Sequence, residues 1–496
     1  MNSFNALMEQ ALSRTANASL ISGNHIRLLK DGSENYPAWL SAIRQAKCSI
    51  LFENYFVIAD EVGEEFATAL MEKARAGVRV RVLYDWFGSL GKARRKFWNK
   101  MRAEGVEVRC YNPPRLSSPL GWFSRDHRKT LTIDGQVGFI SGLCVGKPWL
   151  GIPDRGIEPW RDTGVELQGP AVLELEKAFH QVWGMTGTPI PESELTATGN
   201  SREVGEYSVR VLATVPSMAN MYRLDQFIAA FARKRLWLTD AYFSGTTYYV
   251  QALLAAAQGG VDVRLLLPGA SDVPIFQALS RTGYRVLLKS GVRLYEWNGS
   301  MLHAKTAVAD GRWSRVGSTN LNMTSWFGNC EMDLVIEDKR FAKEMEEMYV
   351  QDLTKASEIS LSVKRPFLVP GSPGSSATKR KGAGNAGRAV AGVMRAGNVV
   401  GAAITNHRIL DPLEARITAG FGLLLVFFVI LFAYFPRALA YPLIALLAWF
   451  AMTLLLKSFL LFRKAQQGTV VSQEHRASSE STSNEVYNQE VSKPHQ

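Results

Sequence analysis

Cysteine is scarce in this chain. Its 496 residues contain only four, Cys48, Cys110, Cys144 and Cys330, and none of them has the spacing of a metal site or a disulfide framework. This pattern argues against a disulfide-stapled secreted protein and is typical of a reducing compartment. Residues 1–20 also lack the apolar core of a secretory signal peptide. We therefore expect the bulk of the chain to be cytoplasmic.

Acidic residues are missing between Ile359 and Leu410. That stretch is rich in proline, glycine, serine and alanine, and its only charged side chains are basic: Lys364, Arg365, Lys379, Arg380, Lys381, Arg388, Arg395 and Arg408. The composition predicts a flexible basic linker over residues 361–415. Its position beside an apolar segment makes an anionic phospholipid surface its expected partner.

Charge of either sign is missing from residues 417–435 and 438–456. Each run would form a helix of about 28 Å, close to the hydrocarbon thickness of a bilayer. Because Pro436 and Arg437 separate the runs, we expect two transmembrane helices within residues 416–460, or a shallow re-entrant hairpin. Basic residues on both flanks place both ends in the cytoplasm, so the protein would be a multi-pass protein of the cytoplasmic membrane. Residues 461–496 are polar and are expected to be disordered.

The chain contains the string H-x-K-x-x-x-x-D twice. The first copy comprises His127, Lys129 and Asp134, and the second comprises His303, Lys305 and Asp310. A pair of small residues begins seven positions after each aspartate. The pair is Ser141-Gly142 in the first copy and Gly317-Ser318 in the second. One such string means little, but two copies with matching downstream elements indicate a duplicated functional motif.

The motifs lie at equivalent places in a longer internal repeat. Apolar strand-like segments match in pairs: residues 50–56 with 236–243, 78–84 with 261–267, and 105–112 with 291–298. Helical patterns follow the first pair, over residues 64–76 and 248–258. The alternation predicts an α/β protein of two pseudo-symmetric repeats, residues 1–200 and 201–360, each a mostly parallel sheet flanked by helices.

The motif residues suit chemistry on a phosphodiester. A histidine and a lysine two positions apart on an extended strand share one face, so two facing repeats would bring together two imidazoles and two ammonium groups. One imidazole can attack phosphorus while the other protonates the leaving oxygen, and the lysines neutralise the remaining oxygens. We expect a phosphohistidine intermediate, resolved by an alcohol or by water, and no metal or other cofactor.

An attacking imidazole needs an acceptor at its second nitrogen. Each repeat offers a carboxylate just before an apolar strand: Asp162 in Trp160-Arg161-Asp162-Thr163, and Glu331 in Asn329-Cys330-Glu331. Acids that lead a strand are common, but the repeat symmetry favours a role in orienting the histidines.

The first repeat has an insertion just before its motif. Residues 113–126 carry Leu120, Trp122 and Phe123 beside Arg115 and Arg125. The segment is either a surface loop folded back on the domain, or a lid or wedge that enters the lipid interface.

These motifs resemble the phospholipase D superfamily, and within it the bacterial cardiolipin synthases. The resemblance rests on the two H-x-K-x-x-x-x-D strings, Gly317-Ser318-Thr319-Asn320, Asn329-Cys330-Glu331 and Trp160-Arg161-Asp162-Thr163, and covers roughly residues 25–355. It implies transfer of a phosphatidyl group from one phosphatidylglycerol to another, with release of glycerol, in a bacterial inner membrane.

The resemblance also implies roles for single residues. His127, Lys129, His303 and Lys305 would contact the phosphate, and Ser141, Ser318 and Asn320 are the expected phosphate-binding residues. Asp134 and Asp310 would help to hold the motif strands. Cys144 departs from the family pattern, which usually has asparagine there, so the two halves are not expected to be equivalent. Analogy with the family favours His127 as the nucleophile.

Other functions remain open at this stage. A phospholipase D that uses water as the acceptor would carry the same motifs, and the acceptor of a transferase could be phosphatidylglycerol, phosphatidylethanolamine or a small alcohol. The net charge of +12 suits anionic lipid but would equally suit a nuclease of the superfamily. The two apolar runs argue against nucleic acid, and both intact histidine–lysine pairs argue against an inactive lipid-binding scaffold. The oligomeric state is not predicted.

Overall fold

The computed structural model describes residues 3–114, 123–194, 202–272 and 274–360, together with scattered residues between 423 and 455. Met1–Pro113 and Trp122–Gly401 belong to one compact unit, and Pro114–Gly121 with Ala402–Gln496 to another. The predicted linker (361–415), the tail (461–496) and most of the two predicted spans (417–435 and 438–456) lie outside the described residues. No helix in the described part of the chain is long and apolar enough to cross a bilayer.

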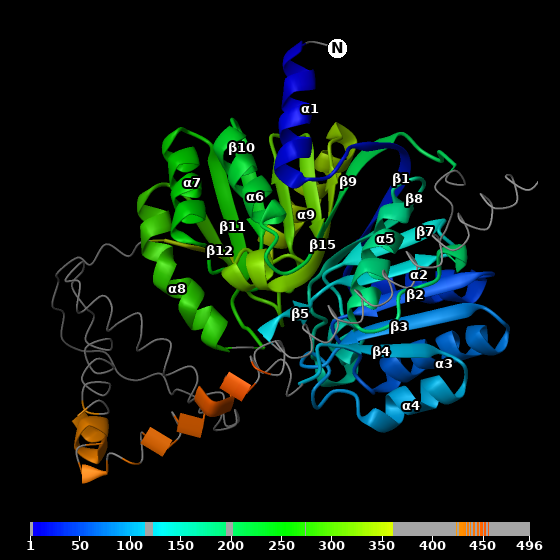
Figure 1. The fold of residues 1–496 in the computed structure, drawn as a ribbon. Coiled ribbons are helices and arrows are strands. Elements are labelled where there is room, and N and C mark those ends of the chain that lie inside the picture. Colours follow the sequence, from blue (N-terminus) through cyan, green and yellow to red (C-terminus); the bar gives the residue numbers. More distant parts are fainter. Residues whose placement is uncertain are drawn as a thin grey trace, which may run out of the picture. The chain divides into compact units, whose positions relative to one another are not determined.

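The first unit is built on one mixed sheet in which the two halves of the chain have corresponding strand orders (Figure 1). The first half runs β1 (Ile21–Lys30), β8 (Thr163–Gln168), β7 (Val137–Ser141), β6 (Lys129–Ile133), β2 (Ser49–Asn54), β3 (Arg79–Asp85) and β4 (Glu107–Tyr111). The second half runs β9 (Tyr207–Thr214), β15 (Asn329–Ile336), β14 (Trp313–Gly317), β13 (Thr306–Ala309), β10 (Arg235–Thr239), β11 (Asp262–Pro268), β12 (Arg293–Trp297) and β16 (Ala356–Ile359). Antiparallel pairing of β1 with β9 joins the halves.

The prediction of a mostly parallel sheet is wrong. Only β2–β3–β4 and β10–β11–β12 form parallel ladders on this path, and the strands that carry and follow the motifs are antiparallel. A tight turn after each motif strand accounts for the antiparallel pairing of β6 with β7 and of β13 with β14. Asp134 and Gly135 have φ values of 53° and 63°, and Asp310 and Gly311 have 52° and 64°. An Asp-Gly turn reverses the chain into a hairpin, whereas a parallel neighbour needs a long crossover.

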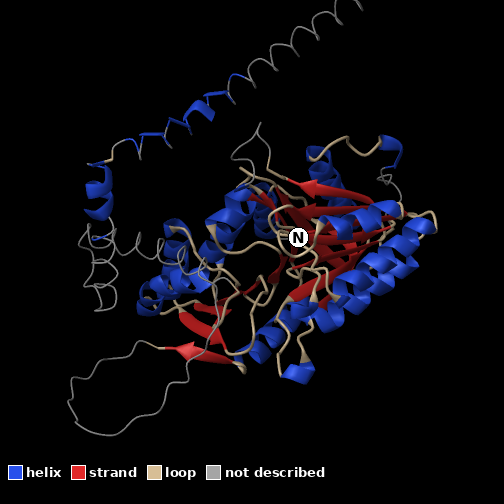
Figure 2. Ribbon diagram, turned by 90° about the horizontal axis from the view of Figure 1, so that it is seen from below, coloured by secondary structure: helices blue, strands red, loops and turns tan. Residues whose placement is uncertain are grey.

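Helices cover the sheet (Figure 2). The two predicted helical stretches are confirmed as α3 (Glu61–Arg75) and α7 (Thr247–Gln258). Their first turns are capped by Asp60, which accepts from the amide of Gly63, and by Thr246, which accepts from that of Tyr249. The other helices are α1 (Ser3–Ala16), α2 (Asp31–Gln45), α4 (Arg95–Ala103), α5 (Val172–Met185), α6 (Asn220–Phe231), α8 (Pro274–Lys289) and α9 (Lys339–Leu353).

The two halves share a hydrophobic core. Buried residues of β7 and β8, such as Ile140 and Val165, belong to the same cluster as Val316 of β14 and Leu334 of β15. Helices α5 and α9 contribute to this cluster from the first and second half respectively. Burial of this surface holds the halves together, so that residues from both can build one site.

Candidate active site

The aspartates of the two motifs lie in the hairpin turns and bind backbone. Asp134 accepts from the amides of Lys47, Cys48 and Ser49, at 2.8, 2.7 and 2.7 Å. Asp310 accepts in the same way from three successive amides at the start of β10, those of Arg233, Lys234 and Arg235. Each turn is thereby clamped to a neighbouring strand at the end of the motif strand that is farthest from the histidine. These contacts support a structural role and leave no free carboxylate for proton transfer.

His127 lies just before β6 rather than on it. The short strand β5 (Arg125–Asp126) pairs in parallel with the start of β15, and the amide of His127 continues this pairing by donating to Cys330 O at 2.9 Å. The register brings His127 Nδ1 to 2.9 Å from Oε2 and 3.1 Å from Oε1 of Glu331. The carboxylate that holds the first histidine therefore comes from the second half of the chain.

His303 has the reciprocal arrangement. Its amide donates to Arg161 O at 2.7 Å, and the amide of Arg161 donates to Met301 O at 2.8 Å. His303 Nδ1 lies 2.7 Å from Oδ2 of Asp162, which belongs to the first half. The sequence placed one carboxylate in each half, and the structure exchanges them, because the segments just before each histidine pair across the interface between the halves.

Both carboxylates are fully buried and held by further donors. Glu331 accepts from Ser318 Oγ at 2.6 Å and from Asn329 Nδ2 at 3.1 Å. Asp162 accepts from Trp149 Nε1 at 3.0 Å and from the Thr163 amide at 2.9 Å. Burial tends to raise the pKa of each carboxyl, but the neighbouring histidine and lysine outweigh it and hold both pKa values below the ordinary range. A charged carboxylate at Nδ1 fixes a proton there and leaves Nε2 of each neutral imidazole as the nucleophilic nitrogen.

The two motif lysines are buried beside the imidazoles. Lys129 Nζ donates to His127 O, and Lys305 Nζ donates to His303 O. Burial lowers the pKa of both ammonium groups, and that of Lys305 falls to about 8, although the charge of Asp162 opposes the shift. Lys129 further lowers the pKa of Lys305, which shows that the two positive charges act on each other across the site.

Both imidazoles are held in the neutral form at pH 7. Burial is the main cause that lowers the pKa of both histidines to about 4. The orienting carboxylates oppose this shift, whereas the lysines add to it. The charge of Lys305 lowers the pKa of His127, and the charge of Lys129 lowers the pKa of His303. The lysine of each motif therefore lies close enough to influence the histidine of the other motif. The structure thus brings the four predicted groups to one centre, and an anion placed there would raise both histidine pKa values.

The three expected phosphate-binding residues differ in their surroundings. Ser318 donates to Glu331, whereas the hydroxyl of Ser141 accepts from the amide of Leu143 at 3.1 Å. Asn320 is 3% exposed. The residue of the first repeat that corresponds to Ser318 is Gly142, not Ser141. A side chain at position 142 would clash with the orienting carboxylate, since its Cβ would lie 2.1 Å from Asp162 Oδ1. The phosphate-binding roles of the two serines and of Asn320 remain predictions.

Aromatic residues around the imidazoles were not anticipated. The Tyr55 ring lies 4.9 Å from that of His127, and the rings of Trp149, Trp160 and Tyr242 lie 5.6, 5.8 and 5.9 Å from that of His303. These rings pack around the imidazoles, whose burial is the main cause of the low histidine pKa values. A signal for the two tyrosines was present, since a Tyr-Phe pair ends the first matched segment in both repeats.

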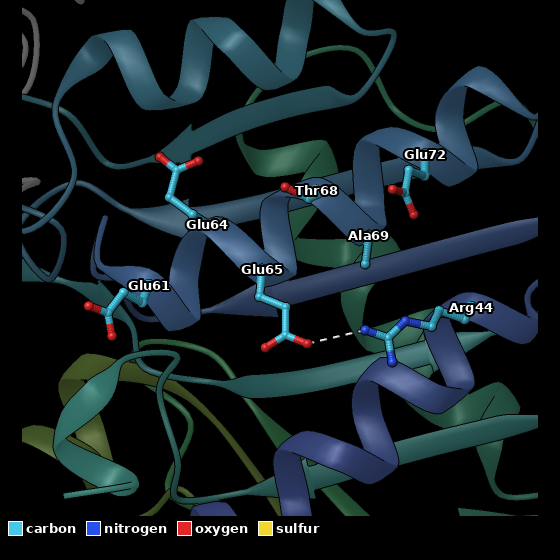
Figure 3. Close-up of a pocket in the computed structure, with 7 residues that line it drawn as sticks. All are labelled: Arg44, Glu61, Glu64, Glu65, Thr68, Ala69 and Glu72. Atoms are coloured by element: carbon cyan, nitrogen blue, oxygen red, sulfur yellow. Dashed lines mark hydrogen bonds and ion pairs between the residues drawn. The ribbon is translucent and has the colours of Figure 1, made fainter. Parts of the chain in front are cut away.

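A separate hollow between α2 and α3 is acidic (Figure 3). Its carboxylates are largely paired: Glu65 with Arg44 at 3.1 Å, Glu64 with Lys100 at 2.8 Å, and Glu61 with Lys147 at 2.9 Å. A row of acids along α3 suits neither a phosphodiester nor an anionic lipid, so the histidine centre is the candidate active site.

The chain is similar to proteins of a known family. The family model described as "Cardiolipin synthase, PLD-like domain" matches residues 39–183 and 227–353. The chain is 33% identical over 350 residues to the cardiolipin synthase of Alkalihalophilus pseudofirmus, covering 69% of each protein. It is 32% identical over 366 residues to cardiolipin synthase A of Pseudomonas fluorescens, covering 72% of this chain and 74% of the relative.

A solved structure shares the fold. The phosphatidylserine synthase of Haemophilus influenzae superposes with a TM-score of 0.57 at 14% identity, over 71% of this chain and 92% of that structure. The family model and the curated cardiolipin synthases confirm the resemblance inferred from the motifs. The chain belongs to the cardiolipin synthase family of phospholipase D-like proteins, and it is an enzyme of the phosphatidyltransferase type.

Proposed function

We propose that this protein forms cardiolipin and glycerol from two molecules of phosphatidylglycerol through a phosphohistidine intermediate. One observation carries the proposal: two imidazoles, each held through Nδ1 by a buried carboxylate, converge with two lysines on one centre. This arrangement supplies a nucleophile, a proton donor and positive charge for a phosphodiester.

In the first half-reaction, Nε2 of one histidine attacks the phosphorus of the donor lipid. A nitrogen–phosphorus bond forms, the bond to the glycerol oxygen breaks, and the opposite imidazolium gives its proton to that oxygen. The histidine that donates the proton must be protonated when it acts. The bound phosphodiester anion favours this state because its negative charge raises the histidine pKa values. Lys129 and Lys305 neutralise the non-bridging oxygens.

In the second half-reaction, the hydroxyl of another phosphatidylglycerol replaces the departed glycerol. The opposite imidazole, now neutral, takes the hydroxyl proton while the new phosphorus–oxygen bond forms and the bond to histidine breaks. Water in place of the lipid hydroxyl would give phosphatidic acid, so hydrolysis is the competing reaction. Analogy with the family assigns His127 as the nucleophile and His303 as the acid and base.

The remaining predicted residues complete the proposal. Asp162 and Glu331 keep the proton on Nδ1 and stabilise each imidazole when it becomes charged or phosphorylated. Ser141, Ser318 and Asn320 are proposed to contribute to phosphate binding, the first two in addition to the bonds described above. Asp134 and Asp310 hold the motif hairpins.

We also propose that the enzyme is a multi-pass protein of the bacterial inner membrane with its catalytic unit in the cytoplasm. Support comes from the uncharged runs 417–435 and 438–456 and from the basic residues on both of their flanks. The basic linker would lie against anionic lipid headgroups, which are also the substrates.

The test is to incubate the detergent-solubilised full chain with labelled phosphatidylglycerol and to separate the products. We expect cardiolipin and free glycerol in equal amounts. If the only lipid product is phosphatidic acid, and no cardiolipin appears even after phosphatidylethanolamine is added as an acceptor, the enzyme is a hydrolase and not a transferase.

A further inference from the structure

Lys92 is a third lysine near the catalytic centre, close enough to feel the charge of Lys129, and it belongs to neither motif. It lies in the segment between β3 and α4, where its carbonyl accepts from the amide of Ala59 at 3.0 Å. Its ammonium group lies over the ring of Phe56, 3.1 Å from the ring centroid. The side chain is partly buried, and within the described residues no carboxylate forms an ion pair with it.

Phe56 connects Lys92 to both halves of the site. Its ring lies 5.7 Å from that of Tyr55, which packs against His127, and 5.9 Å from that of Trp149, which packs against His303. The backbone of Phe56 also contacts the Cys144 thiol, at the position that Asn320 takes in the second half. Phe56 therefore links Lys92 to aromatic residues that pack against both imidazoles.

Burial disfavours the charged form of Lys92, and the Phe56 ring offsets only part of this cost. Burial is the main cause that lowers its pKa, and the charge of Lys129 adds to the shift, opposed by Cys144 and by Asp272 of the second half. Lys129 and Lys305 are each bound to the carbonyl of their own motif histidine, whereas the Lys92 ammonium group has no such hydrogen bond to any of the described residues. Asp162 and Glu331 bind the two histidines rather than Lys92, which leaves the Lys92 ammonium group available for an anionic ligand.

The proposed transfer brings a second phosphodiester to the site. The acceptor phosphatidylglycerol carries its own phosphate three carbons from the attacking hydroxyl. While that hydroxyl approaches the phosphohistidine, two phosphates lie one glycerol unit apart in a partly desolvated site and repel each other. Water and free glycerol have no such phosphate and meet no such repulsion.

We propose that Lys92 binds the phosphate of the acceptor lipid and thereby favours a phospholipid over water or a free alcohol as the acceptor. The assignment rests on the proposed function. It makes Lys92 a determinant of acceptor specificity, distinct from the four motif residues that act on the donor phosphate.

Two reactions of the same full-length enzyme test this role. Cardiolipin synthesis needs an acceptor with a phosphate, whereas exchange of labelled free glycerol into phosphatidylglycerol uses the same donor and the same intermediate with an acceptor that has none. In Lys92→Gln we expect cardiolipin synthesis to fall about ten- to hundredfold, with a raised KM for the acceptor, and exchange to fall far less. Lys92→Arg keeps the charge and should retain most of the synthesis.

Lys96→Gln is the matched control, because Lys96 is an exposed lysine four residues further on in the chain. It should leave both reactions unchanged. Equal loss of synthesis and exchange in Lys92→Gln, or no loss of either, would overturn the assignment. Should that variant fail to fold, Lys92→Met gives the same comparison with the apolar stem retained. A wild-type enzyme that performs neither reaction would instead contradict the proposed function.

Discussion

The imidazole of His127 is bound to the carboxylate of Glu331, 204 positions later in the chain, at 2.9 Å. The reciprocal pair, His303 and Asp162, is separated by 141 positions. Each half therefore contains one histidine and the carboxylate that orients the histidine of the other half. Neither half alone can present a correctly oriented imidazole, so activity requires the joined sheet.

Removal of the carboxylate charge should be costly although the shape is kept. In Glu331→Gln and in Asp162→Asn, the amide can no longer stabilise the charged imidazole or fix its proton on Nδ1. We expect cardiolipin synthesis to fall roughly 10²- to 10⁴-fold in each variant, the range that positioned acid–base groups contribute. The measurement is the initial rate in detergent micelles.

A surface carboxylate provides the comparison. Glu347 is exposed and pairs only with Lys343, at 3.7 Å, among the described residues. Glu347→Gln should keep the full rate. If Glu331→Gln also kept it, Glu331 would be no more than a packing residue.

Each motif histidine should be indispensable. His127→Ala and His303→Ala should each abolish turnover, while circular dichroism shows that the fold is retained. The two variants differ in one respect. The variant that keeps the nucleophile should still accumulate label on the protein after a single exposure to labelled phosphatidylglycerol, provided that the leaving glycerol can be protonated by water.

Acid quenching and electrophoresis detect the labelled protein. Label in His303→Ala but not in His127→Ala would identify His127 as the nucleophile, and the opposite result would reverse the proposed roles. Full activity in either variant would refute the two-histidine mechanism.

Stability should depend on pH through the same histidines. Both have a pKa of about 4 in the folded protein and about 6.5 when unfolded, so the unfolded chain binds more protons between these values. The neutral imidazoles therefore stabilise the fold above pH 6.5, and this stabilisation is lost as the pH falls toward 4. Its upper limit is about 3 kcal/mol for each histidine.

Urea unfolding between pH 4 and pH 7 measures the effect. The double variant His127→Gln/His303→Gln cannot titrate at these positions and should show a flatter profile than the wild type. Identical slopes for the two proteins would show that the histidines are not held neutral.

Gly142 should tolerate no side chain. A Cβ at this position would lie 2.1 Å from Asp162 Oδ1, so Gly142→Ala must displace the carboxylate that orients His303. We expect a loss of about 1–3 kcal/mol in the free energy of unfolding, typical of overpacking, and a fall in the transfer rate of at least about tenfold. Gly184→Ala is the control, because the nearest atom to its added Cβ is 4.0 Å away, on Pro189.

The local part of the fold could be predicted from the sequence. Apolar runs and helical periodicity gave β2, β3 and β4, their counterparts β10, β11 and β12, and the helices α3 and α7. The strands β8 and β15 were also expected, but the antiparallel orientation of the strands from β6 to β8 and from β13 to β15 was missed, because the composition of a strand does not reveal the direction of its neighbour. The Asp-Gly pairs at 134–135 and 310–311 were the available signal, since only a tight turn requires positive φ at both positions.

The catalytic groups of the site could be identified from the sequence, but the pairing of each histidine with its carboxylate could not. The duplicated strings identified His127, Lys129, His303 and Lys305, and the repeat drew attention to Asp162 and Glu331, because those patterns are local. Which carboxylate holds which histidine depends on strand pairing between segments that lie more than a hundred residues apart. The neutral state of the imidazoles, the aromatic walls and the place of Lys92 depend in turn on burial. Side-chain identity fixes what each group can do, whereas sheet register and desolvation, which exist only in the folded chain, decide which groups meet and in which charge state.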